Sequence, residues 1–419
     1  MMKRFLSLFM ALILVASFAC AEGGKQVTVY PVAVAPELYT AFPGGEGTAF
    51  AGGFKTGFGS AITFKGFDEE GNLQFYGASD RGPSLDLFDK DGNEVENTKV
   101  FPAPDFSPVI GTITLKDGKA VVEEAITLKK ADGTPLSGLP LPAGETGATG
   151  EIARDIYGNE LTYDPEGFDP EGIAVDSEGN FWLGDEYGPF IGKFAADGTL
   201  IKMYKPGDGL PEILKHRIAN RGFESLTISP SGKVFAVLQS VMNIEGKTQK
   251  TSTFIRILEM DPQTGETKMY AYPVVVSEYA RPKDCKLGDA FAIDDTTLLI
   301  VEQGKLADKS MRNIIYKVDL SKATDITGVT HNGQELEYIA DAQELAGVIT
   351  YASKEVYLDL RTLGWTAEKA EGICLTDIGA FVAIIEDDFG LSGSEQVEGK
   401  DTIQLLPNES DPSQIWIIE

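Results

Sequence analysis

The sequence predicts an all-β protein, a β-propeller of six or seven blades, each a four-stranded antiparallel sheet. Turn sequences such as DEEGN at 68–72, DSEGN at 176–180 and DPQTGE at 261–266 lie between short runs rich in Val, Ile, Phe, Tyr and Thr. Such runs, separated by turns that contain Gly, are typical of antiparallel hairpins. Long amphipathic helical patterns are scarce, and several of the hairpins repeat.

Five hairpin segments resemble one another, and this repetition favours a propeller over a pair of packed sheets. Each has a small or acidic residue near its start, followed by an apolar strand, a turn and a second apolar strand. A polar or acidic residue follows the second strand. The intervals between the repeats are irregular, which is typical of blades of about 40–50 residues with loop insertions. Because the gap after the first repeat is the longest, a further, weaker blade is expected within 85–160. The repeated segments are 59–82, 170–188, 223–240, 288–304 and 370–390.

The N-terminus has the features of a secretory signal peptide. Two positive residues precede an apolar run from Phe5 to Phe18, and the small residues Ala19–Ala21 follow. The run is too short for a comfortable transmembrane span, and no later segment is apolar enough for one. We expect cleavage after residues 1–21 and a single secreted or periplasmic domain, 22–419. Acylation of Cys20, as in a lipoprotein, is the alternative.

Three further segments are interpreted in chain order. DKDGN at 89–93 superficially resembles a calcium loop, but its Gly is not at the sixth position that such a loop requires, so a hairpin turn is expected. ADGTPLSGLPLPAGETGATG at 131–150 is rich in Gly, Pro, Ala and Thr and predicts an exposed loop. KPGDGLPEILKHRIANRG at 205–222 predicts a loop with a short helix.

Charge and composition exclude several classes of function. The formal net charge of -28 disfavours binding to nucleic acid and to anionic lipid, because both need Lys and Arg to neutralise phosphate. His216 and His331 are the only histidines, so a multi-His zinc site is excluded, and a Ser-His-Asp hydrolase would have to use one of them. Cys285 and Cys374 either form a disulfide or remain free. We expect a monomer.

Carboxylates recur at the start of four repeats, and propeller geometry brings such positions together. The first strand of every blade lines the central channel, so equivalent residues lie at the same height around the axis. Several carboxylates cannot all stay ionised in a narrow channel without a counter-charge. Oxygen ligands with almost no His or Cys match Ca²⁺, or Mg²⁺, and not zinc or copper. These residues are Glu171, Glu224, Asp289 and Glu371.

The ends of the second strands add polar residues near the same blade edge. For any single acid, the alternative is that it accepts backbone N–H groups at a turn or lies in solvent. These end residues are Asp80, Asp185, Glu186, Gln239, Glu302, Glu386, Asp387 and Asp388.

A metal ion in an acidic channel has two uses. It could hold a phosphorylated substrate while a carboxylate activates water and basic residues clamp the phosphate. It could instead only join the blades, with ligand recognition elsewhere. The candidate substrate-binding residues are Arg81, Arg221, Arg281 and Lys305, which lie next to repeat boundaries.

Four ordered blocks resemble the phytase-like family, described as esterase-like activity of phytase, whose members are secreted bacterial propeller proteins. The blocks are DPEGIAVDSEGNFWLGDEYGPFIGKF, NRGFESLTISPSGKVFAVLQS, LLIVEQG followed by IIYKVDLSKATD, and AEGICLTDIGAFVAIIEDDFG. They cover roughly residues 45–419. The resemblance implies a propeller fold and a calcium-dependent phosphoester hydrolysis.

Carried onto this chain, the resemblance implies a set of site residues. Glu171, Glu186 and Glu224 are the candidate catalytic carboxylates. Asp289 lies in a block where the family pattern is loose, and Gln239 ends its block without a charge. The candidate metal ligands are Glu171, Asp185, Glu224, Asp289, Glu302, Glu371 and Asp387.

The sequence leaves three functions open. The first is a secreted, calcium-dependent hydrolase of phosphoric or carboxylic esters that acts on a small molecule. The second is a non-catalytic propeller of the cell envelope that binds a ligand or partner and holds a structural calcium ion. The third is a lactonase-like propeller hydrolase, which shares the acidic axial metal and differs in substrate.

Overall fold

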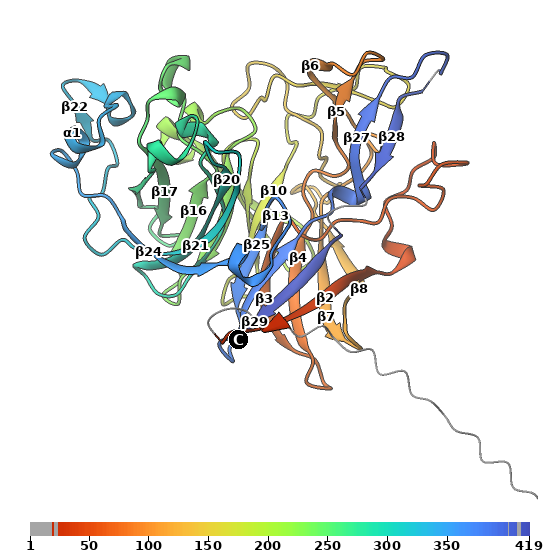
Figure 1. Cartoon of the computed structure of the whole chain (residues 1–419), viewed down its shortest axis with the longest axis horizontal. Helices are drawn as coiled ribbons and strands as arrows, with labels where there is room; N and C mark the ends of the chain where they lie inside the picture. Colours follow the sequence, from red (N-terminus) through yellow and green to blue (C-terminus); the bar gives the residue numbers. More distant parts are fainter. Residues whose placement is uncertain (1–18, 21–23, 401, 409–411) are drawn as a thin grey trace, which may run out of the picture.

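The structure is a computed structural model that describes residues 19–20, 24–400, 402–408 and 412–419 (Figure 1). The predicted signal peptide lies outside these residues except for β1 (Ala19–Cys20), which pairs with the next strand. Strands dominate, and the one α-helix among the described residues, α1 (Ala342–Ala346), is short, so the predicted all-β class is confirmed. No helix in this part of the chain is long and apolar enough to cross a bilayer.

Most strands belong to five units of four strands that pair in antiparallel order. Two units, the second and the third, are meanders of consecutive strands, and the second carries an additional short parallel strand at its edge. The strands of the first four units are β3 (Ala61–Phe67), β4 (Leu73–Ala78), β7 (Val109–Lys116) and β8 (Lys119–Thr127); β10 (Pro170–Val175), β11 (Phe181–Asp185), β12 (Phe190–Phe194) and β13 (Leu200–Pro206), with β14 (Gly209–Leu210); β15 (Phe223–Ile228), β16 (Val234–Leu238), β17 (Phe254–Met260) and β18 (Thr267–Pro273); and β19 (Lys286–Ala292), β20 (Thr297–Lys305), β21 (Met311–Asp319) and β24 (Ser353–Asp359).

The fifth unit combines the two ends of the described chain. β25 (Gly372–Leu375), β26 (Phe381–Ile385) and β29 (Gln414–Ile418) are completed by β2 (Gln26–Val34). The first half of β2 pairs antiparallel with β29, and its last three residues pair parallel with β8 of the first unit. β2 therefore joins the fifth unit to the first.

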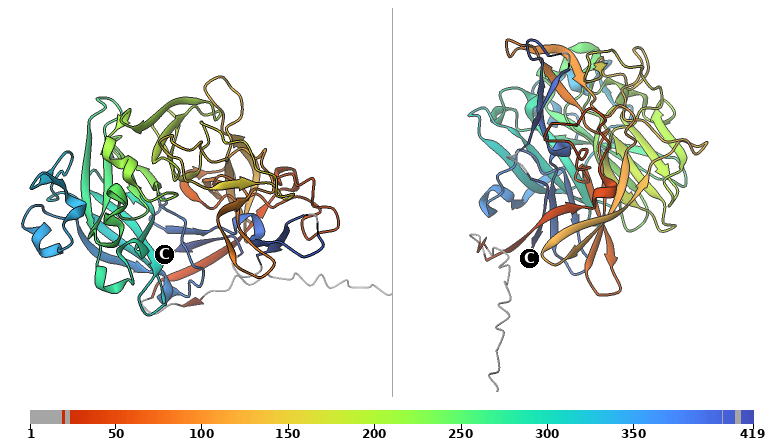
Figure 2. Two further views of the ribbon diagram at one scale, coloured as in Figure 1. Left: turned by 90° about the horizontal axis from the view of Figure 1, so that it is seen from above. Right: turned by 90° about the vertical axis from the view of Figure 1, so that its right-hand side faces the viewer.

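The first strands of the five units form a closed ring. β3, β10, β15, β19 and β25 contact one another in this order, and β25 contacts β3. Figure 2 shows the units arranged around this centre in the view from above. Apolar clusters fill the spaces between facing sheets; in one of them Phe181 and Phe194 of the second unit pack with Ala78 and Ile110 of the first.

The expected six or seven blades are not confirmed, because the described residues form five ring units. The segment 85–160 was expected to hold a weaker blade, and this prediction is wrong. It supplies β7 and β8 to the first unit and three strands to a separate sheet at the top of Figure 1. That sheet consists of β5 (Leu85–Phe88), β6 (Glu94–Val100), β9 (Ile152–Arg154), β27 (Leu391–Glu395) and β28 (Gln404–Pro407).

The acidic turn sequences form hairpin turns by one mechanism. Asp89 Oδ1 accepts the backbone N–H groups of Asp91 and Asn93 at 2.8 and 2.9 Å, and Gly92 has a φ of +80°. Asp68 and Asp176 make the equivalent bonds two and four residues ahead. DKDGN joins the antiparallel strands β5 and β6, which confirms the predicted hairpin turn.

The two long insertions differ from each other. Residues 131–150 form a loop as expected, but it is only partly exposed, because Leu136 and Leu141 are buried between the first two units. Residues 205–222 contain the expected short helix, as a 3-10 turn. Cys285 and Cys374 are both buried and free.

Short elements occupy the connections. They are the hairpin of β22 (Thr330–His331) and β23 (Gln334–Glu335) and the 3-10 helices Pro36–Leu38, Glu212–His216, Ile244–Gly246, Thr248–Lys250, Val276–Glu278, Pro282–Asp284, Leu336–Tyr338, Leu360–Leu363 and Asp388–Gly390.

Candidate functional site

The acids at the repeat starts lie where the strands of the central ring begin. In the second and third units, the pairing register shifts around Glu171 and Glu224, and in the fourth it shifts across Gly288 and Asp289. Each of these acids therefore lies in a β-bulge, a feature that redirects side chains at the edge of a sheet. The sequence repeat detected this position without showing the bulge.

Small residues after these acids let neighbouring strands approach closely. A Cβ atom added at Gly172 would lie 2.1 Å from the backbone nitrogen of Leu226. One added at Gly372 would lie 2.8 Å from the backbone nitrogen of Ile62. Because any larger residue would push the ring apart at these points, the glycines keep the starts of adjacent units, and hence their acids, close together.

Three carboxylates of the second unit converge. Asp169, Glu171 and Glu186 each offer an oxygen, and these three oxygens lie within 4.8 Å of one another. Asp169 precedes β10 and Glu186 follows β11. The start of the first strand and the end of the second strand of one hairpin therefore both contribute a carboxylate. We call these three residues the acid group. The donor set is entirely carboxylate oxygen, which fits a hard divalent cation such as Ca²⁺.

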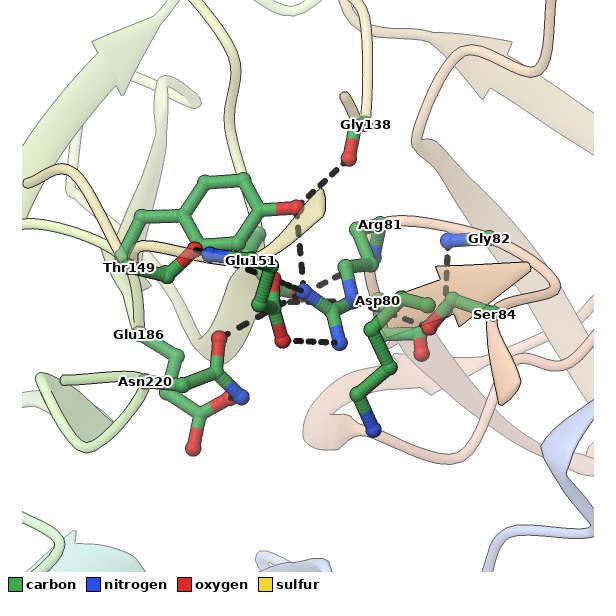
Figure 3. A network of polar contacts seen from close by, with 12 residues as sticks. Asp80, Arg81, Gly82, Ser84, Gly138, Thr149, Glu151, Glu186 and Asn220 are labelled. Atoms are coloured by element: carbon green, nitrogen blue, oxygen red, sulfur yellow. Dashed lines mark hydrogen bonds and ion pairs between the residues drawn. The ribbon is translucent and has the colours of Figure 1, made fainter. Parts of the chain in front are cut away.

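A buried arginine holds Asp169 in place. The Arg81 backbone N–H donates to Asp169 Oδ1 at 2.9 Å, and its Nε lies 3.6 Å from Oδ2. The guanidinium also donates to Glu151 Oε2 at 2.9 Å and to Ser84 at 2.9 Å. Figure 3 shows Arg81 among Glu151, Ser84 and Asn220. Only 6% of Arg81 is exposed, so the structure places it behind the acid group and not in an open cavity.

Amide side chains connect the acid group to Glu224. Gln239 Nε2 donates to Glu186 Oε1 at 2.8 Å and to Glu224 Oε2 at 2.6 Å. Asn220 Nδ2 donates to Glu186 Oε2 at 2.7 Å. The structure therefore brings the three predicted catalytic carboxylates, Glu171, Glu186 and Glu224, into one neighbourhood.

Burial and mutual repulsion raise the pKa values of this neighbourhood. Burial, then the nearby Glu224, raises the pKa of both Glu171 and Glu186 well above the ordinary value of a glutamate. Burial raises the pKa of Asp169 to about 6, against the opposing effect of Arg81. Burial and Glu371 raise the pKa of Glu224 to about 7. Without a cation, Glu171 and Glu186 therefore keep their protons to higher pH than an ordinary glutamate, and Glu224 titrates near neutral pH.

Comparison with known proteins assigns the chain to a family. The family described as Phytase-like, esterase-like activity of phytase, matches residues 57–388. The chain belongs to the phytase-like family. The acid group, Glu224 and Glu371 all lie within the matched region.

One curated relative and several solved structures are similar to this phytase-like chain. An uncharacterised secreted protein of Arthroderma benhamiae is 29% identical, and the match covers 37% of each chain, so the chain spans little more than a third of that relative's length. A virginiamycin B lyase of Staphylococcus aureus with quinupristin is 14% identical, covers 87% of this chain and 94% of its own, and has a TM-score of 0.33. An α-L-arabinofuranosidase of Podospora anserina in complex with cellotriose is 10% identical, with coverages of 93% and 96% and a TM-score of 0.37. Both TM-scores are below 0.5.

Three of the predicted metal ligands of the phytase-like chain have protein partners for both carboxylate oxygens. Asp185 accepts the backbone N–H groups of Asp169 and Gly188 at 2.8 and 2.6 Å. Asp289 accepts those of Ala290 and Ile373, both at 2.8 Å, and so connects the fourth unit to the fifth.

Glu302 is the third of these ligands, and it lies among basic and phenolic side chains. It accepts bonds from Tyr272 at 2.7 Å and Tyr279 at 2.8 Å and pairs with Arg312 and Lys354. Although its burial opposes the effect, Lys354 holds the pKa of Glu302 below its ordinary value. The structure therefore keeps Glu302 apart from the acid group.

Two acids of the fifth unit, Glu371 and Glu386, line a cavity of about 240 Å³. Glu371 lines it and pairs with Lys369 at 2.6 Å. Glu386 also lines it; one oxygen accepts from Ser60 at 2.9 Å, and Oε1 is buried without a partner among the described residues. Asp387 pairs with Lys55 at 3.0 Å.

Three of the four predicted basic residues line one cavity of about 490 Å³, which we call the cationic pocket. Arg221, Arg281 and Lys305 were predicted; Lys286, Lys309 and Lys369 line it as well. Sequence reasoning missed these three lysines because they lie in loops and at a strand start outside the compared positions.

Asp169 and Gln303 were also missed. Asp169 stands before the repeat start, where the other repeats have no matching acid, although the Asp-Pro-Glu-Gly run of the family block includes it. Gln303 follows Glu302 at a strand end and lines the cationic pocket.

Proposed function

We propose that this phytase-like protein is a secreted or periplasmic, calcium-dependent hydrolase of phosphoesters or other esters of small molecules. The observation that carries the proposal is the acid group, whose three carboxylate oxygens lie within 4.8 Å of one another. The family match supports hydrolase chemistry, and the secreted relative supports the location.

We propose further that the five ring units are the blades of a five-bladed propeller and that the chain acts as a monomer. The closed contacts of the first strands support the blade arrangement. In this arrangement the acid group lies at the axial end of the second blade.

Asp169, Glu171 and Glu186 would hold the divalent ion, with Glu224 and Glu371 beside it. When bound, Ca²⁺ supplies a Lewis acid that polarises an ester oxygen and makes an adjacent water more acidic. Mg²⁺ would fit less well, because it demands stricter octahedral geometry. Asp185 and Asp289 support this site through their bonds to backbone N–H groups, and Arg81 keeps Asp169 in position.

Glu224 is the candidate general base. Its pKa of about 7 suits proton transfer at neutral pH, since a catalytic base works best when its pKa is near the working pH. The Gln239 amide holds one carboxylate oxygen of Glu224 at 2.6 Å and thereby fixes its orientation beside Glu186. In this proposal Glu224 takes the proton from the attacking water and returns it to the leaving group.

The test is a turnover assay of residues 22–419 with phytate, p-nitrophenyl phosphate, short acyl esters and lactones, in calcium and in chelator. Calcium-dependent turnover is expected, with a loss of at least a hundredfold in Glu171→Gln and in Glu224→Gln. Glu69→Gln, at an exposed turn, serves as the matched control. If no substrate is turned over faster than by the Glu171→Gln, Glu224→Gln double variant, the hydrolase proposal is wrong.

One observation favours a second function, a non-catalytic envelope propeller with a structural ion. Several acids near the axis, Asp185 and Asp289 among them, accept backbone N–H groups that connect strands. An ion at the acid group would strengthen the same connections. This alternative predicts that chelator lowers the melting temperature, through loss of ligand binding to the native state, while no substrate in the assay is hydrolysed.

A further inference from the structure

The cationic pocket has a charge opposite to that of the molecule as a whole. The chain has a net charge of -28, yet the pocket is lined by the six basic residues named above and by only two acids, Asp284 and Glu368. Such a local reversal of charge concentrates anions at one place on a protein that otherwise repels them.

Two of these positive charges have no ion-pair partner among the described residues. They are the ammonium groups of Lys305 and Lys309, whereas Lys286 is attracted by the nearby Glu224 and Glu186. Arg281, by contrast, pairs with Asp284 at 2.8 Å, and Lys369 pairs with Glu371 at 2.6 Å. Lys305 and Lys309, without an ion-pair partner in the described chain, leave the pocket ready to accept an anion.

A buried amide supplies an independent indication of a ligand. Gln303 lines the pocket and is only 1% exposed, and its Nε2 has no hydrogen-bond partner among the described residues. Its Oε1 accepts the backbone N–H of Ala370 at 2.9 Å. Because a flipped amide would point its NH₂ group at this N–H, the orientation is fixed, and Nε2 is a donor without an acceptor. An anionic oxygen in the pocket would provide that acceptor.

The cationic pocket adjoins the cavity that Glu371 and Glu386 line. Lys369 lines both the cationic pocket and the cavity of Glu371 and Glu386. Arg221 follows Asn220, whose amide donates to Glu186 of the acid group. Lys286 of the pocket is also attracted by Glu224 and Glu186, so one ligand can reach from the pocket toward these acids.

We infer that the cationic pocket binds an oxyanion group of the substrate, a phosphate or a carboxylate, that is not the group being hydrolysed. This inference rests on the proposed function for its link to catalysis, but anion binding itself does not. It narrows the substrate class to esters that carry a second anionic group. Arg221, Lys286, Lys305 and Gln303 supply the donors, and Lys369 separates the two ends of the substrate.

Calorimetric titration with inorganic phosphate and with citrate tests the binding step. We expect one of the two to bind in the presence of chelator, and Lys305→Gln with Lys309→Gln to weaken that binding at least tenfold. Gln303→Glu should abolish it, because its carboxylate keeps the acceptor for Ala370 and replaces the free donor by a negative charge. Lys119→Gln, at an exposed position of β8, is the matched control and should bind as the unaltered chain does.

The outcome distinguishes this inference from the hydrolase proposal. Binding of neither anion, binding that disappears in chelator, or equal affinity in the Lys305, Lys309 double variant and the Lys119→Gln control would overturn the inference. Tighter binding of phosphate or of citrate identifies the group. If turnover is observed, the same double variant should raise KM for a bisphosphate ester by a larger factor than KM for p-nitrophenyl acetate, which has no second anionic group. Anion binding without any turnover would refute the hydrolase and retain the pocket.

Discussion

Gln239 is the neutral residue that allows two carboxylates to lie close together. It occupies a strand end where other repeats have an acid, and one nitrogen donates to both Glu186 and Glu224. A carboxylate at this position would add a third negative charge and remove both bonds. What looked in the sequence like a departure from the acidic pattern is therefore a donor that orients the candidate base.

Arg81 offers a test of how the acid group is held. Arg81→Gln would leave Glu151 and Asp169 without their buried positive partner, and removal of one member of a buried ion pair costs about 3–5 kcal/mol. We expect that loss in the free energy of unfolding, measured in urea with chelator present.

The matched control is Arg281→Gln, because Arg281 is 58% exposed in its side chain and pairs with a residue three positions away. Exposed pairs contribute about 0–1 kcal/mol, so this variant should unfold nearly as the unaltered chain does. An Arg81→Gln protein as stable as the Arg281→Gln control would show that Arg81 does not support the acid group.

The raised pKa values predict how stability depends on pH. Asp169 and Glu224 have folded pKa values of about 6 and about 7, above their ordinary values of 3.8 and 4.5. Between the unfolded and the folded pKa, each group binds more protons in the folded state. The contribution of these two groups to stability is therefore largest below their ordinary pKa values and falls as pH rises through about 6 and about 7. A two-unit shift corresponds to about 3 kcal/mol.

We therefore expect the melting temperature in chelator to be lower at pH 8 than at pH 5, and calcium to restore most of the difference. Calcium acts because the deprotonated carboxylates that are costly alone become its ligands. Differential scanning calorimetry at both pH values measures this, with Glu224→Gln as a variant that should flatten the dependence. A melting temperature in chelator that rises from pH 5 to pH 8 would contradict the assignment.

At the scale of the elements, the start of each ring strand depends on a small residue after the acid. Gly172→Ala would place a Cβ atom 2.1 Å from the Leu226 nitrogen, where no flexible side chain can yield. Such overpacking typically costs about 1–3 kcal/mol, and it would also move Glu171 relative to Glu224. We expect a lower melting temperature and weaker calcium binding.

Gly393→Ala is the matched control, because Gly393 lies in β27 and its added Cβ would meet only a side-chain carbon at 3.6 Å. Calorimetric titration with calcium and a melting curve are measured for both variants. Equal calcium affinity in the two would show that the close approach at Gly172 does not set the spacing of the acids.

Hairpins and their turns were predictable, because alternating apolar runs and Asp-x-x-Gly-Asn turns are local properties. The partners that a side chain near the end of a strand would contact were not predictable. Glu302 occupies the repeat position that corresponds to Glu186, yet its oxygens accept hydrogen bonds from Tyr272 and Tyr279 and pair with Lys354. Only the packed sheets decide which of two similar positions faces the axis.

The number of units could not be predicted from local sequence patterns either. Residues 85–160 contain enough strands for a blade, but two strands complete the first unit. The other three belong to a separate sheet, in which β5 pairs with β27 from near the C-terminus. The spacing between repeats depends on the length of the inserted segments. It does not indicate with which strands the inserted strands pair. The acid group was predicted in part, since two of its three members occupy repeat positions and Asp169 does not.

At the scale of the whole molecule, the ring closes through β2. Its residues Val27–Pro31 pair with β29, and Val32–Val34 pair with β8, so one strand connects the fifth unit to the first. Val27, Val32 and Val34 are all buried. Burial of a valine side chain contributes about 1.5–3 kcal/mol, and without β2 the edges of both units would be open to pairing with other chains.

A chain that begins at Ala35 should therefore lose several kcal/mol of stability, because three such side chains and two strand pairings are removed together. It should also elute as aggregates in size-exclusion chromatography, whereas a chain that begins at Lys25 keeps all of β2 and should elute and melt as the protein beginning at residue 22 does. The acid group lies on the second unit and not at this junction. The first strands of all five units contact one another in a closed ring, however, and β10 of the second unit contacts β3 of the first. Opening the ring should thus weaken calcium binding at a distance, and unchanged calcium affinity in a soluble chain lacking β2 would show that the second and third units hold their acids without closure.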